Sequence, residues 1–247
     1  MLNKNDHPLF DLIAFDADDT LWHTERLYLE ALDTLIKVIP TPMTVKELEQ
    51  YLYQKETVNI NLYGYGIKSY TLSMIETAIE LGSDSLKAGQ IQQILELGKG
   101  MLGAQIQLLP HVEETLRALQ MRYNLMVITK GELLEQEAKL KRSGVAGYFR
   151  SYEVVSVKNQ ATYHTLLQRH GVEPQRFLMI GNSLKSDILP VLELGGHALH
   201  IPYEITWAHE LVDEPLTAAY YELEHIGQLP NWLEMLEQNE SNNPKTV

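Results

Sequence analysis

Residues 9–20 read LFDLIAFDADDT and decide the fold. A short apolar run reaches Asp16 and gives way at once to the polar stretch 17–20. Apolar runs of this length are typical of strands that are buried on both faces of a parallel sheet. Ligands of open parallel sheets bind at the carboxyl ends of the strands. Asp16 and Asp18 are therefore the first candidate functional residues.

Further apolar runs follow along the chain, and each ends in a small or polar residue. Helix-like stretches at 132–142 and 161–170 separate three of them. This alternation predicts an α/β fold with a doubly wound, Rossmann-like parallel sheet. The late run AAYYELEHI, residues 218–226, is expected to add an edge strand. The other predicted strands are 124–129, 151–156, 176–182 and 197–202.

The segment between Asp16 and Asn124 is much longer than the roughly 10 to 30 residues that a crossover between parallel strands needs. Its apolar residues recur at helical spacing, and none of it has the pattern of a strand. The predicted helices are 25–39, 45–53, 69–81 and 85–102. We therefore predict an α/β core of residues 1–23 and 106–238, an inserted all-helical domain of residues 24–105, and a disordered polar tail of residues 239–247.

The 247-residue chain has a formal net charge of −13, which argues against a nucleic-acid partner because polyanion binding needs clustered basic residues. The basic group Lys139, Lys141 and Arg142 is expected on a solvated helix face. The sequence has no signal-peptide pattern and no run of the roughly 18 apolar residues that a membrane span requires, so we expect a cytoplasmic protein without membrane contact. The absence of cysteine leaves only oxygen and nitrogen groups for catalysis.

Polar residues follow the other predicted strands as well. Thr129 and Lys130 end the second strand, Lys158 follows the third, and Asn182 and Asp187 follow the fourth. Parallel strands bring these ends to one edge of the sheet. Carboxylates at close range repel one another, so a divalent cation with oxygen ligands, Mg2+ above all, is implied at this edge.

Four segments, FDADDTLW, VITKG, VVSVK and IGNSLKSD, resemble in order the four motifs of the haloacid dehalogenase-like hydrolase superfamily. The resemblance spans the predicted core, and the helical insertion resembles the mobile cap of many members. It implies that Asp16 is a nucleophile that forms an aspartyl-phosphate and that Asp18 is a general acid and then a base. It also implies that Lys158, Thr129 and the amides around Ala17 stabilise the phosphoryl group. Lys130 is an alternative to Lys158 as the site lysine.

The resemblance further implies a Mg2+ ion held by Asp16, by the main-chain carbonyl of Asp18 and by an acidic residue of the last motif. Asn182 stands where that acidic residue is usual, so either Asn182 ligates through its amide oxygen or Asp187 takes its place. An asparagine near this position also occurs in the metal-free dehalogenase branch. Asp18 favours a phosphatase, because a phosphoester oxygen needs a proton on leaving and a halide does not.

The cap implies a small phosphorylated metabolite as substrate, since a closed site excludes water and large partners. Tyr63 and Tyr65, in the segment 61–68, are the candidate residues that contact the substrate. Two other functions remain open: a metal-independent 2-haloacid dehalogenase that uses Asp16, and a binding module for phosphate ligands that has lost turnover. A monomer and a homodimer are both compatible with the sequence.

Overall fold

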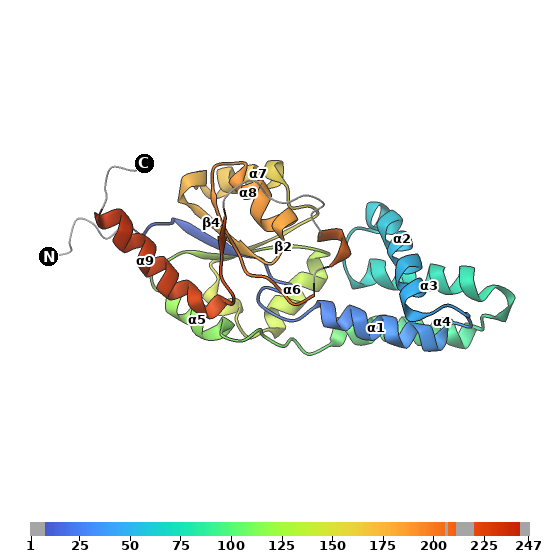
Figure 1. Ribbon diagram of the computed structural model, residues 1–247. Coiled ribbons are helices and arrows are strands. Elements are labelled where there is room, and N and C mark those ends of the chain that lie inside the picture. The colour runs from blue at the N-terminus through green and yellow to red at the C-terminus, as the bar shows by residue number, and fades with distance from the viewer. Residues whose placement is uncertain (1–7, 206, 211–219, 243–247) are drawn as a thin grey trace. The chain divides into compact units, whose positions relative to one another are not determined.

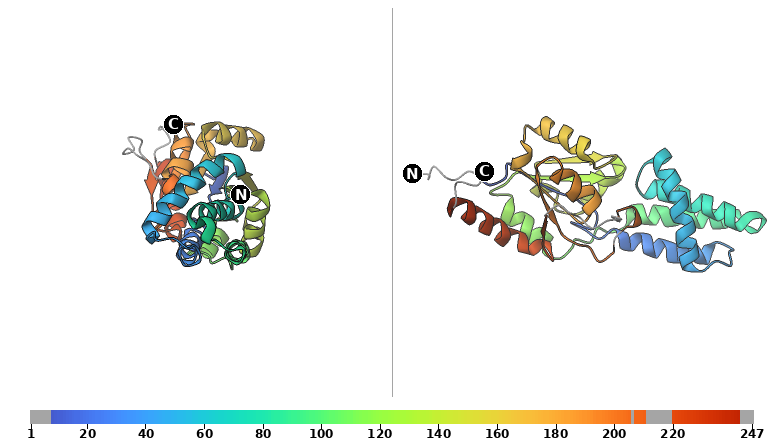
Figure 2. Two further views of the ribbon diagram at one scale, coloured as in Figure 1. Left: turned by 90° about the vertical axis from the view of Figure 1, so that its right-hand side faces the viewer. Right: turned by 45° about the horizontal axis from the view of Figure 1, so that its top comes forward.

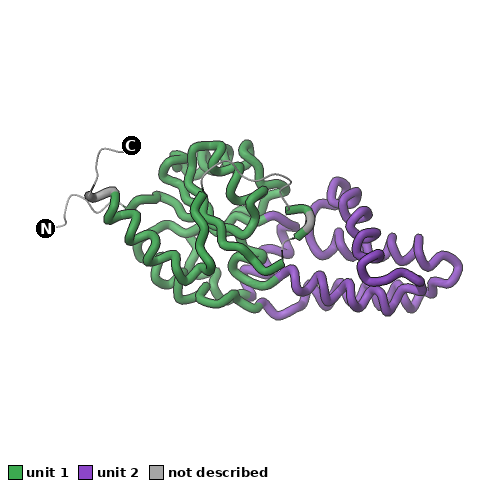
Figure 3. Tube along the Cα trace, viewed as in Figure 1, with its two compact units in different colours: residues 1–23, 107–129, 143–247 green, residues 24–106, 130–142 purple. Residues whose placement is uncertain are grey.

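The computed structural model describes residues 8–205, 207–210 and 220–242 of the chain. The chain forms two compact units, which Figure 3 shows in different colours. We call residues 1–23, 107–129 and 143–247 the α/β unit, and residues 24–106 and 130–142 the helical unit. Segment 130–142, which the sequence analysis assigned to the core, thus groups with the inserted helices.

The α/β unit is built on a six-stranded sheet in the order β3-β2-β1-β4-β5-β6. The pairs β1–β2, β1–β4, β4–β5 and β5–β6 are parallel. This order confirms the predicted doubly wound fold, including the edge strand beyond β5. The strands are β1 (Leu12–Phe15), β2 (Leu125–Lys130), β3 (Ser151–Val155), β4 (Phe177–Gly181), β5 (His197–His200) and β6 (Tyr221–Glu222).

The register of the central strands aligns their carboxyl ends. Phe15 of β1 lies opposite Val127 of β2 and opposite Ile180 of β4. The residues that follow each strand therefore emerge at one edge of the sheet. These strands carry almost only apolar side chains, and all of β1 and β4 is buried. Because parallel strands are covered on both faces, such continuous apolar runs are expected.

Helices α7 (Gln160–His170) and α8 (Leu189–Leu192) cover one face of this sheet (Figure 1). Tyr163, Leu166 and Leu167 of α7 pack there against Met126 and Met179 of the strands. Helices α5 (Val112–Leu119) and α9 (Leu229–Asn242) lie together on the other side, as the right view in Figure 2 also shows.

Helix α9 corrects one prediction, because residues 239–242 are helical and not a disordered tail. Their polar sequence continues a helix that is anchored by the buried residues Leu229 and Leu233. Polar composition alone does not distinguish a disordered tail from the end of a helix. The rest of the predicted tail, residues 243–247, lies outside the described residues, as does the beginning of the predicted edge strand.

The helical unit contains α1 (Glu25–Val38), α2 (Val45–Tyr63), α3 (Ile67–Gly82), α4 (Ala88–Gly103) and α6 (Leu133–Arg142). Helix α2 packs on α3, α3 on α4, and α4 on α1. Leu35, Leu48, Ile67, Met74 and Ile94 are fully buried in the resulting core. The helical character predicted for this insertion therefore matches the elements that the structure shows.

Helix α2 is ten residues longer than predicted, since it ends at Tyr63 and not at Tyr53. The reciprocal contacts of Thr44 and Glu47 form a capping box that fixes its beginning. Beyond Leu52, its buried positions are occupied by the polar residues Glu56 and Asn59. These residues break the apolar periodicity on which the prediction depended, although the helix continues.

The predicted segment 61–68 is therefore mostly helical, with only residues 64–66 between α2 and α3. Gly66 has a φ of +119°, a region that favours glycine. A Cβ atom there would lie 2.9 Å from Glu135 Oε2. The same carboxylate oxygen accepts a hydrogen bond of 2.9 Å from the main-chain N–H of Ile67, at the beginning of α3. A carboxylate at a helix N-terminus is stabilising.

Lys139 of α6 is buried and lies 3.3 Å from the Glu135 carboxylate. The expectation of a solvated face is wrong for this residue, because Glu135 provides a buried partner for its charge. Lys141 and Arg142 are exposed, as expected.

Among the described residues, no helix is both long enough and apolar enough to cross a membrane.

Candidate active site

Asp16 continues directly from β1 and lies at the carboxyl edge of the sheet. Its main-chain N–H donates to the carbonyl of Ile180 at 2.8 Å, which extends the pairing with β4 by one residue. Phe15 and Ala17 on either side are fully buried, and Asp16 itself is 7% exposed. Burial raises the pKa of the Asp16 carboxyl, and the charge of Lys158 opposes this shift. A rigid strand end thus holds a carboxylate that is nearly closed off from water.

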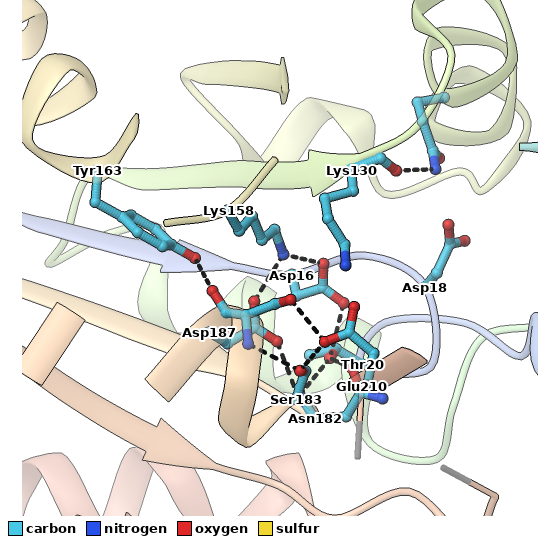
Figure 4. Close-up of polar contacts among 12 residues, drawn as sticks. Asp16, Asp18, Thr20, Lys130, Lys158, Tyr163, Asn182, Ser183, Asp187 and Glu210 are labelled. Atoms are coloured by element: carbon cyan, nitrogen blue, oxygen red, sulfur yellow. Dashed lines mark hydrogen bonds and ion pairs between the residues drawn. The ribbon is translucent and has the colours of Figure 1, made fainter. Parts of the chain in front are cut away.

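Lys158 bridges Asp16 and Asp187 (Figure 4). Its ammonium donates to Asp16 Oδ1, and to Asp187 Oδ1 at 2.7 Å. Lys158 follows β3 and precedes α7, whose first turn is capped by Asn159. Burial alone would lower the pKa of Lys158, but the charges of Asp16 and Asp187 outweigh it and raise this pKa. The ammonium therefore stays charged at physiological pH.

Two hydrogen-bond donors contact the Asp187 carboxylate, and the main chain at Gly181 lies close to it. Its Oδ2 atom accepts from the main-chain N–H of Ser183 at 3.1 Å, while Oδ1 accepts from Lys158. A Cβ atom at Gly181 would lie 2.1 Å from Asp187 Oδ2. Glycine at the end of β4 is thus required for this carboxylate to reach Lys158. The contact holds the Asp187 carboxylate against the Lys158 ammonium.

Thr20 connects the loop after β1 to the loop after β4. Its hydroxyl lies 3.3 Å from Asp16 Oδ2 and 3.2 Å from Asn182 Oδ1. The same hydroxyl oxygen accepts a hydrogen bond of 3.1 Å from the main-chain N–H of Asn182. Since one hydroxyl has one proton, it donates to either Asp16 or Asn182 at a time. Thr20 therefore braces the two loops and contacts both candidate ligands.

Asp18 lies in the loop after β1, and its Oδ1 atom accepts a hydrogen bond of 2.8 Å from the indole N–H of Trp22. In Figure 4 its side chain stands apart from the residues that surround Asp16. Asp19, next in the chain, has a φ of +61°, and its N–H donates to the carbonyl of Trp22 at 2.7 Å. The loop thus turns tightly around Trp22, which fixes the orientation of Asp18.

The remaining predicted residues fall into both units. In the α/β unit, Ala17 is buried after β1, and Thr129 is buried near the end of β2, the strand beside β1. In the helical unit, Lys130 Nζ lies 4.9 Å from the centre of the Tyr65 ring. Tyr63 ends α2 with about half of its surface exposed. The structure thus brings together Asp16, Lys158, Asn182 and Asp187, and separately Tyr65 and Lys130.

Two residues near this group were not predicted from sequence. The Tyr163 hydroxyl donates at 3.0 Å to the main-chain carbonyl of Ser186, the residue before Asp187. Glu210 accepts hydrogen bonds from the side chains of Ser183 and Ser186, which flank the turn after Asn182. Glu210 does not stand at the end of a predicted strand and belongs to none of the four motifs. No sequence pattern therefore marked it as a site residue. The Ser183 hydroxyl accepts a hydrogen bond from the main-chain N–H of Ser186 and so caps the turn that follows.

The donors around Asp16 are oxygen atoms, which suit Mg2+. This cation binds through one or two carboxylates and keeps several waters. Asp16 offers a carboxylate, Asn182 an amide oxygen and the loop at Asp18 a main-chain carbonyl. Across residues 8–205, 207–210 and 220–242, no three His, Cys, Asp or Glu side chains group closely enough to hold a metal by themselves. The donor set therefore fits a hard, partly hydrated cation and not a thiolate or imidazole metal site.

Residues 10–195 match the family described as haloacid dehalogenase-like hydrolase. The chain belongs to this family. The match includes Asp16, Lys158, Asn182 and Asp187, and it ends before Glu210. The haloacid dehalogenase-like assignment also agrees with the doubly wound sheet and with a polar site at its carboxyl edge. It makes the protein a hydrolase.

Individual relatives support the same haloacid dehalogenase-like family. A hydrolase of this family from Xanthomonas campestris has 35% sequence identity, with 96% of each chain covered and a TM-score of 0.84. A glyceraldehyde 3-phosphate phosphatase from Methanothermobacter thermautotrophicus is 27% identical over 209 residues, which are 79% of this chain and 87% of the relative. A 2-haloacid dehalogenase from Pseudomonas syringae shares the fold, with 22% identity, a TM-score of 0.63 and coverage of 92% and 99%.

Proposed function

We propose that the protein is a magnesium-dependent phosphatase that hydrolyses a small phosphorylated metabolite through an aspartyl-phosphate on Asp16. The observation that carries this proposal is the buried ammonium of Lys158 on the Asp16 carboxylate, at the edge of the sheet. A fixed cation beside a nucleophilic carboxylate suits phosphoryl transfer, which needs mainly positioning and charge neutralisation. The similarity to the phosphatase from Methanothermobacter thermautotrophicus supports a phosphate ester as the substrate class.

The proposed reaction has two steps. A carboxylate oxygen of Asp16 forms a bond to phosphorus while the bond from phosphorus to the leaving oxygen breaks, and Asp18 donates a proton to that oxygen. Asp18 then takes a proton from a water molecule whose oxygen attacks the same phosphorus. This second step releases inorganic phosphate and restores the Asp16 carboxylate. The hydrogen bond from Trp22 holds Asp18 in the loop where both proton transfers are proposed.

Several groups are proposed to stabilise the phosphoryl oxygens. Lys158 supplies a positive charge, and the Thr129 hydroxyl and the main-chain N–H groups around Ala17 supply hydrogen bonds. Mg2+, when bound, would neutralise charge on the phosphoryl group as it is transferred. Asp16, the main-chain carbonyl of Asp18 and the Asn182 amide oxygen are the proposed ligands. Asp187, whose oxygens accept from Lys158 and Ser183, is proposed to orient Lys158 instead.

We propose that the helical unit is a cap that reads the leaving group. Tyr65 holds Lys130 by a cation–π contact, and Lys130 comes directly after Thr129 at the end of β2. The carbonyl of Lys130 also accepts a hydrogen bond of 2.8 Å from Gln136. Within the helical unit, the turn between α2 and α3 is thus attached to segment 130–142. Tyr63 and Tyr65 are the proposed substrate contacts of this cap.

A 2-haloacid dehalogenase is the second candidate, and the amide of Asn182 favours it. Asparagine adds no charge for a cation, and dehalogenation by Asp16 would need neither a cation nor a proton donor to the halide. The presence of Asp18 favours the phosphatase, because an alkoxide leaving group requires a proton. Metal dependence therefore separates the two candidates.

The test is hydrolysis of p-nitrophenyl phosphate with and without Mg2+ by the wild type, Asp16→Asn and Asp84→Asn. Asp84 is an exposed residue of the helical unit, so its variant makes the same chemical change away from the site. We expect activity that requires Mg2+, is lost in Asp16→Asn and is retained in Asp84→Asn. A parallel assay measures chloride release from 2-chloropropionate without Mg2+.

Asp16-dependent chloride release without phosphate hydrolysis would replace the phosphatase by the dehalogenase. If the folded wild type turned over neither compound but bound inorganic phosphate equally well with and without the Asp16 carboxylate, the binding module would be favoured. A panel of phosphorylated metabolites, scored by the ratio of kcat to KM, would then identify the substrate of an active enzyme.

A further inference from the structure

Glu210 lies beside the position at which the last motif lacks an acidic residue. Its Oε2 atom accepts from the Ser183 hydroxyl, and from the Ser186 hydroxyl at 2.6 Å (Figure 4). Ser183 follows Asn182 directly in the chain. Two hydroxyl donors on one oxygen suit a carboxylate acceptor. A carboxyl group therefore lies next to Asn182, but it comes from a different part of the chain.

The segment that carries Glu210 is attached to the site on two sides. Lys185 Nζ donates to the main-chain carbonyl of His209 at 2.9 Å. The Tyr203 hydroxyl lies 2.7 Å from His23 Nδ1, which follows the first motif. Trp207 and His209 also pack together, with their ring centres 4.6 Å apart. These contacts hold Glu210 in place although it lies beyond residue 195, where the match to the family ends.

The charges of the site show why such a residue is needed. Asp187 and Asp16 share the single positive charge of Lys158. Asn182 adds no charge, whereas an aspartate would add one negative unit. A divalent cation bound at Asp16 would then be held by one unit of negative charge less than at a site with an aspartate in this position. Glu210 restores the missing unit next to the amide.

We propose that Glu210 supplies the negative charge that Asn182 lacks and thereby sets the affinity of the site for Mg2+. This inference rests on the proposed function, because it concerns the same cation. It assigns Glu210 as a positioning residue for the cation and not as a catalytic residue. Neither the four motifs nor the matched residues 10–195 include this role.

A purely structural role of Glu210 would predict a different effect of Glu210→Gln on Mg2+ binding. If Glu210 only held the turn from Ser183 to Ser186, a neutral acceptor of the same shape would be sufficient. Glu210→Gln keeps such an acceptor and removes the charge. Adding Asn182→Asp to Glu210→Gln then returns a carboxylate to the neighbouring position, without restoring the original hydrogen bonds to the serines.

The experiment is calorimetric titration of the full chain with Mg2+, without substrate. The variants are Glu210→Gln, the double variant Asn182→Asp with Glu210→Gln, and Glu173→Gln as a matched control. Glu173 is exposed and precedes β4, at the opposite edge of the sheet from the site. We expect Glu210→Gln to weaken Mg2+ binding by about 10- to 100-fold, as loss of outer ligand partners does. The double variant should recover the affinity, and Glu173→Gln should leave it unchanged.

Wild-type Mg2+ affinity in Glu210→Gln would overturn the inference and leave the proposed phosphatase intact. A wild type that binds no Mg2+ would overturn the inference together with the metal dependence in the proposed function. If Glu210→Gln does not fold, Glu210→Asp provides the test, because it keeps the charge. That variant should bind Mg2+ far more tightly than Glu210→Ala, and equal affinities of the two would overturn the inference.

Discussion

The Lys158 ammonium lies 2.7 Å from Asp187 Oδ1 and donates at the same time to Asp16. One buried cation is thus shared by two buried carboxylates from adjacent loops of the sheet. Removal of one partner from such a group leaves charge without compensation, which is far more costly than the loss of a surface ion pair. The arrangement therefore links the stability of the fold to the charge balance of the site.

Replacement of Lys158 by methionine should lower the free energy of unfolding by about 3–5 kcal/mol, because two carboxylates would remain buried without their cation. Urea denaturation at neutral pH measures this loss. Lys99→Met is the matched control, since Lys99 pairs with Glu96 at the surface and its loss should cost far less. Equal effects of the two variants would contradict the shared ion pair.

Replacement of Thr20 by valine should cost about 1–3 kcal/mol, because the partly buried main-chain N–H of Asn182 loses its acceptor. The change should also lower kcat more than it raises KM, since Asp16 loses a hydroxyl contact at 3.3 Å. Thr20→Ser keeps the hydroxyl and should behave like the wild type in both respects. Steady-state kinetics and urea denaturation of the two variants test this role, and equal losses in both would exclude it.

Alanine at Gly181 should disrupt the site, because its Cβ atom would lie 2.1 Å from Asp187 Oδ2. Asp187 would have to move away from Lys158, at a cost of about 3 kcal/mol or more. At Gly147, no heavy atom lies within 4 Å of an added Cβ, so Gly147→Ala is the matched control. We expect a clear fall in the melting temperature for Gly181→Ala alone. A wild-type melting temperature in that variant would show that the contact is not needed.

Burial raises the pKa of Glu56, in α2, to about 7. The folded protein thus keeps this proton at pH values at which the unfolded chain has lost it. The resulting stabilisation is complete below the ordinary pKa of glutamate, near 4.5, and disappears as the pH rises through about 7. Its size is roughly 3 kcal/mol.

Glu56→Gln should remove this pH dependence and make the protein more stable than the wild type at pH values above 7. Urea denaturation of both proteins at acidic and at mildly alkaline pH measures the difference between their stabilities. Glu76→Gln, in α3, provides a control for the loss of a glutamate in the helical unit. A wild type and a Glu56→Gln variant with parallel pH profiles would be incompatible with a raised pKa.

The strand ends could be predicted from sequence because parallel strands have continuous apolar runs, and a polar residue at the end of such a run is conspicuous. Asp16, Lys158 and Asp187 were selected in this way, and the structure brings them together. The pairing of Asp187 with Lys158 could not be predicted, since it depends on the close approach at Gly181.

Glu210 and the second half of α2 escaped prediction for related reasons. Glu210 acts through Ser183 and Ser186, and its own surroundings in the sequence have no strand or motif. Glu56 and Asn59 occupy buried helix positions with polar side chains, so the apolar period fails where the helix continues. The partners of Glu210 are distant in the sequence, and the burial of Glu56 and Asn59 depends on tertiary contacts. Neither can be seen in a local sequence pattern.

The central claim is that Asp16 becomes phosphorylated during turnover, and trapping of that intermediate tests it most directly. The protein is mixed with p-nitrophenyl phosphate and Mg2+, quenched and treated with borohydride, which reduces an acyl phosphate to an alcohol. Mass spectrometry of the peptide that contains residue 16 should then find homoserine in place of aspartate, and only when substrate was present. Unmodified Asp16 in an enzyme that is turning over, or reduction at a different carboxylate, would contradict the account.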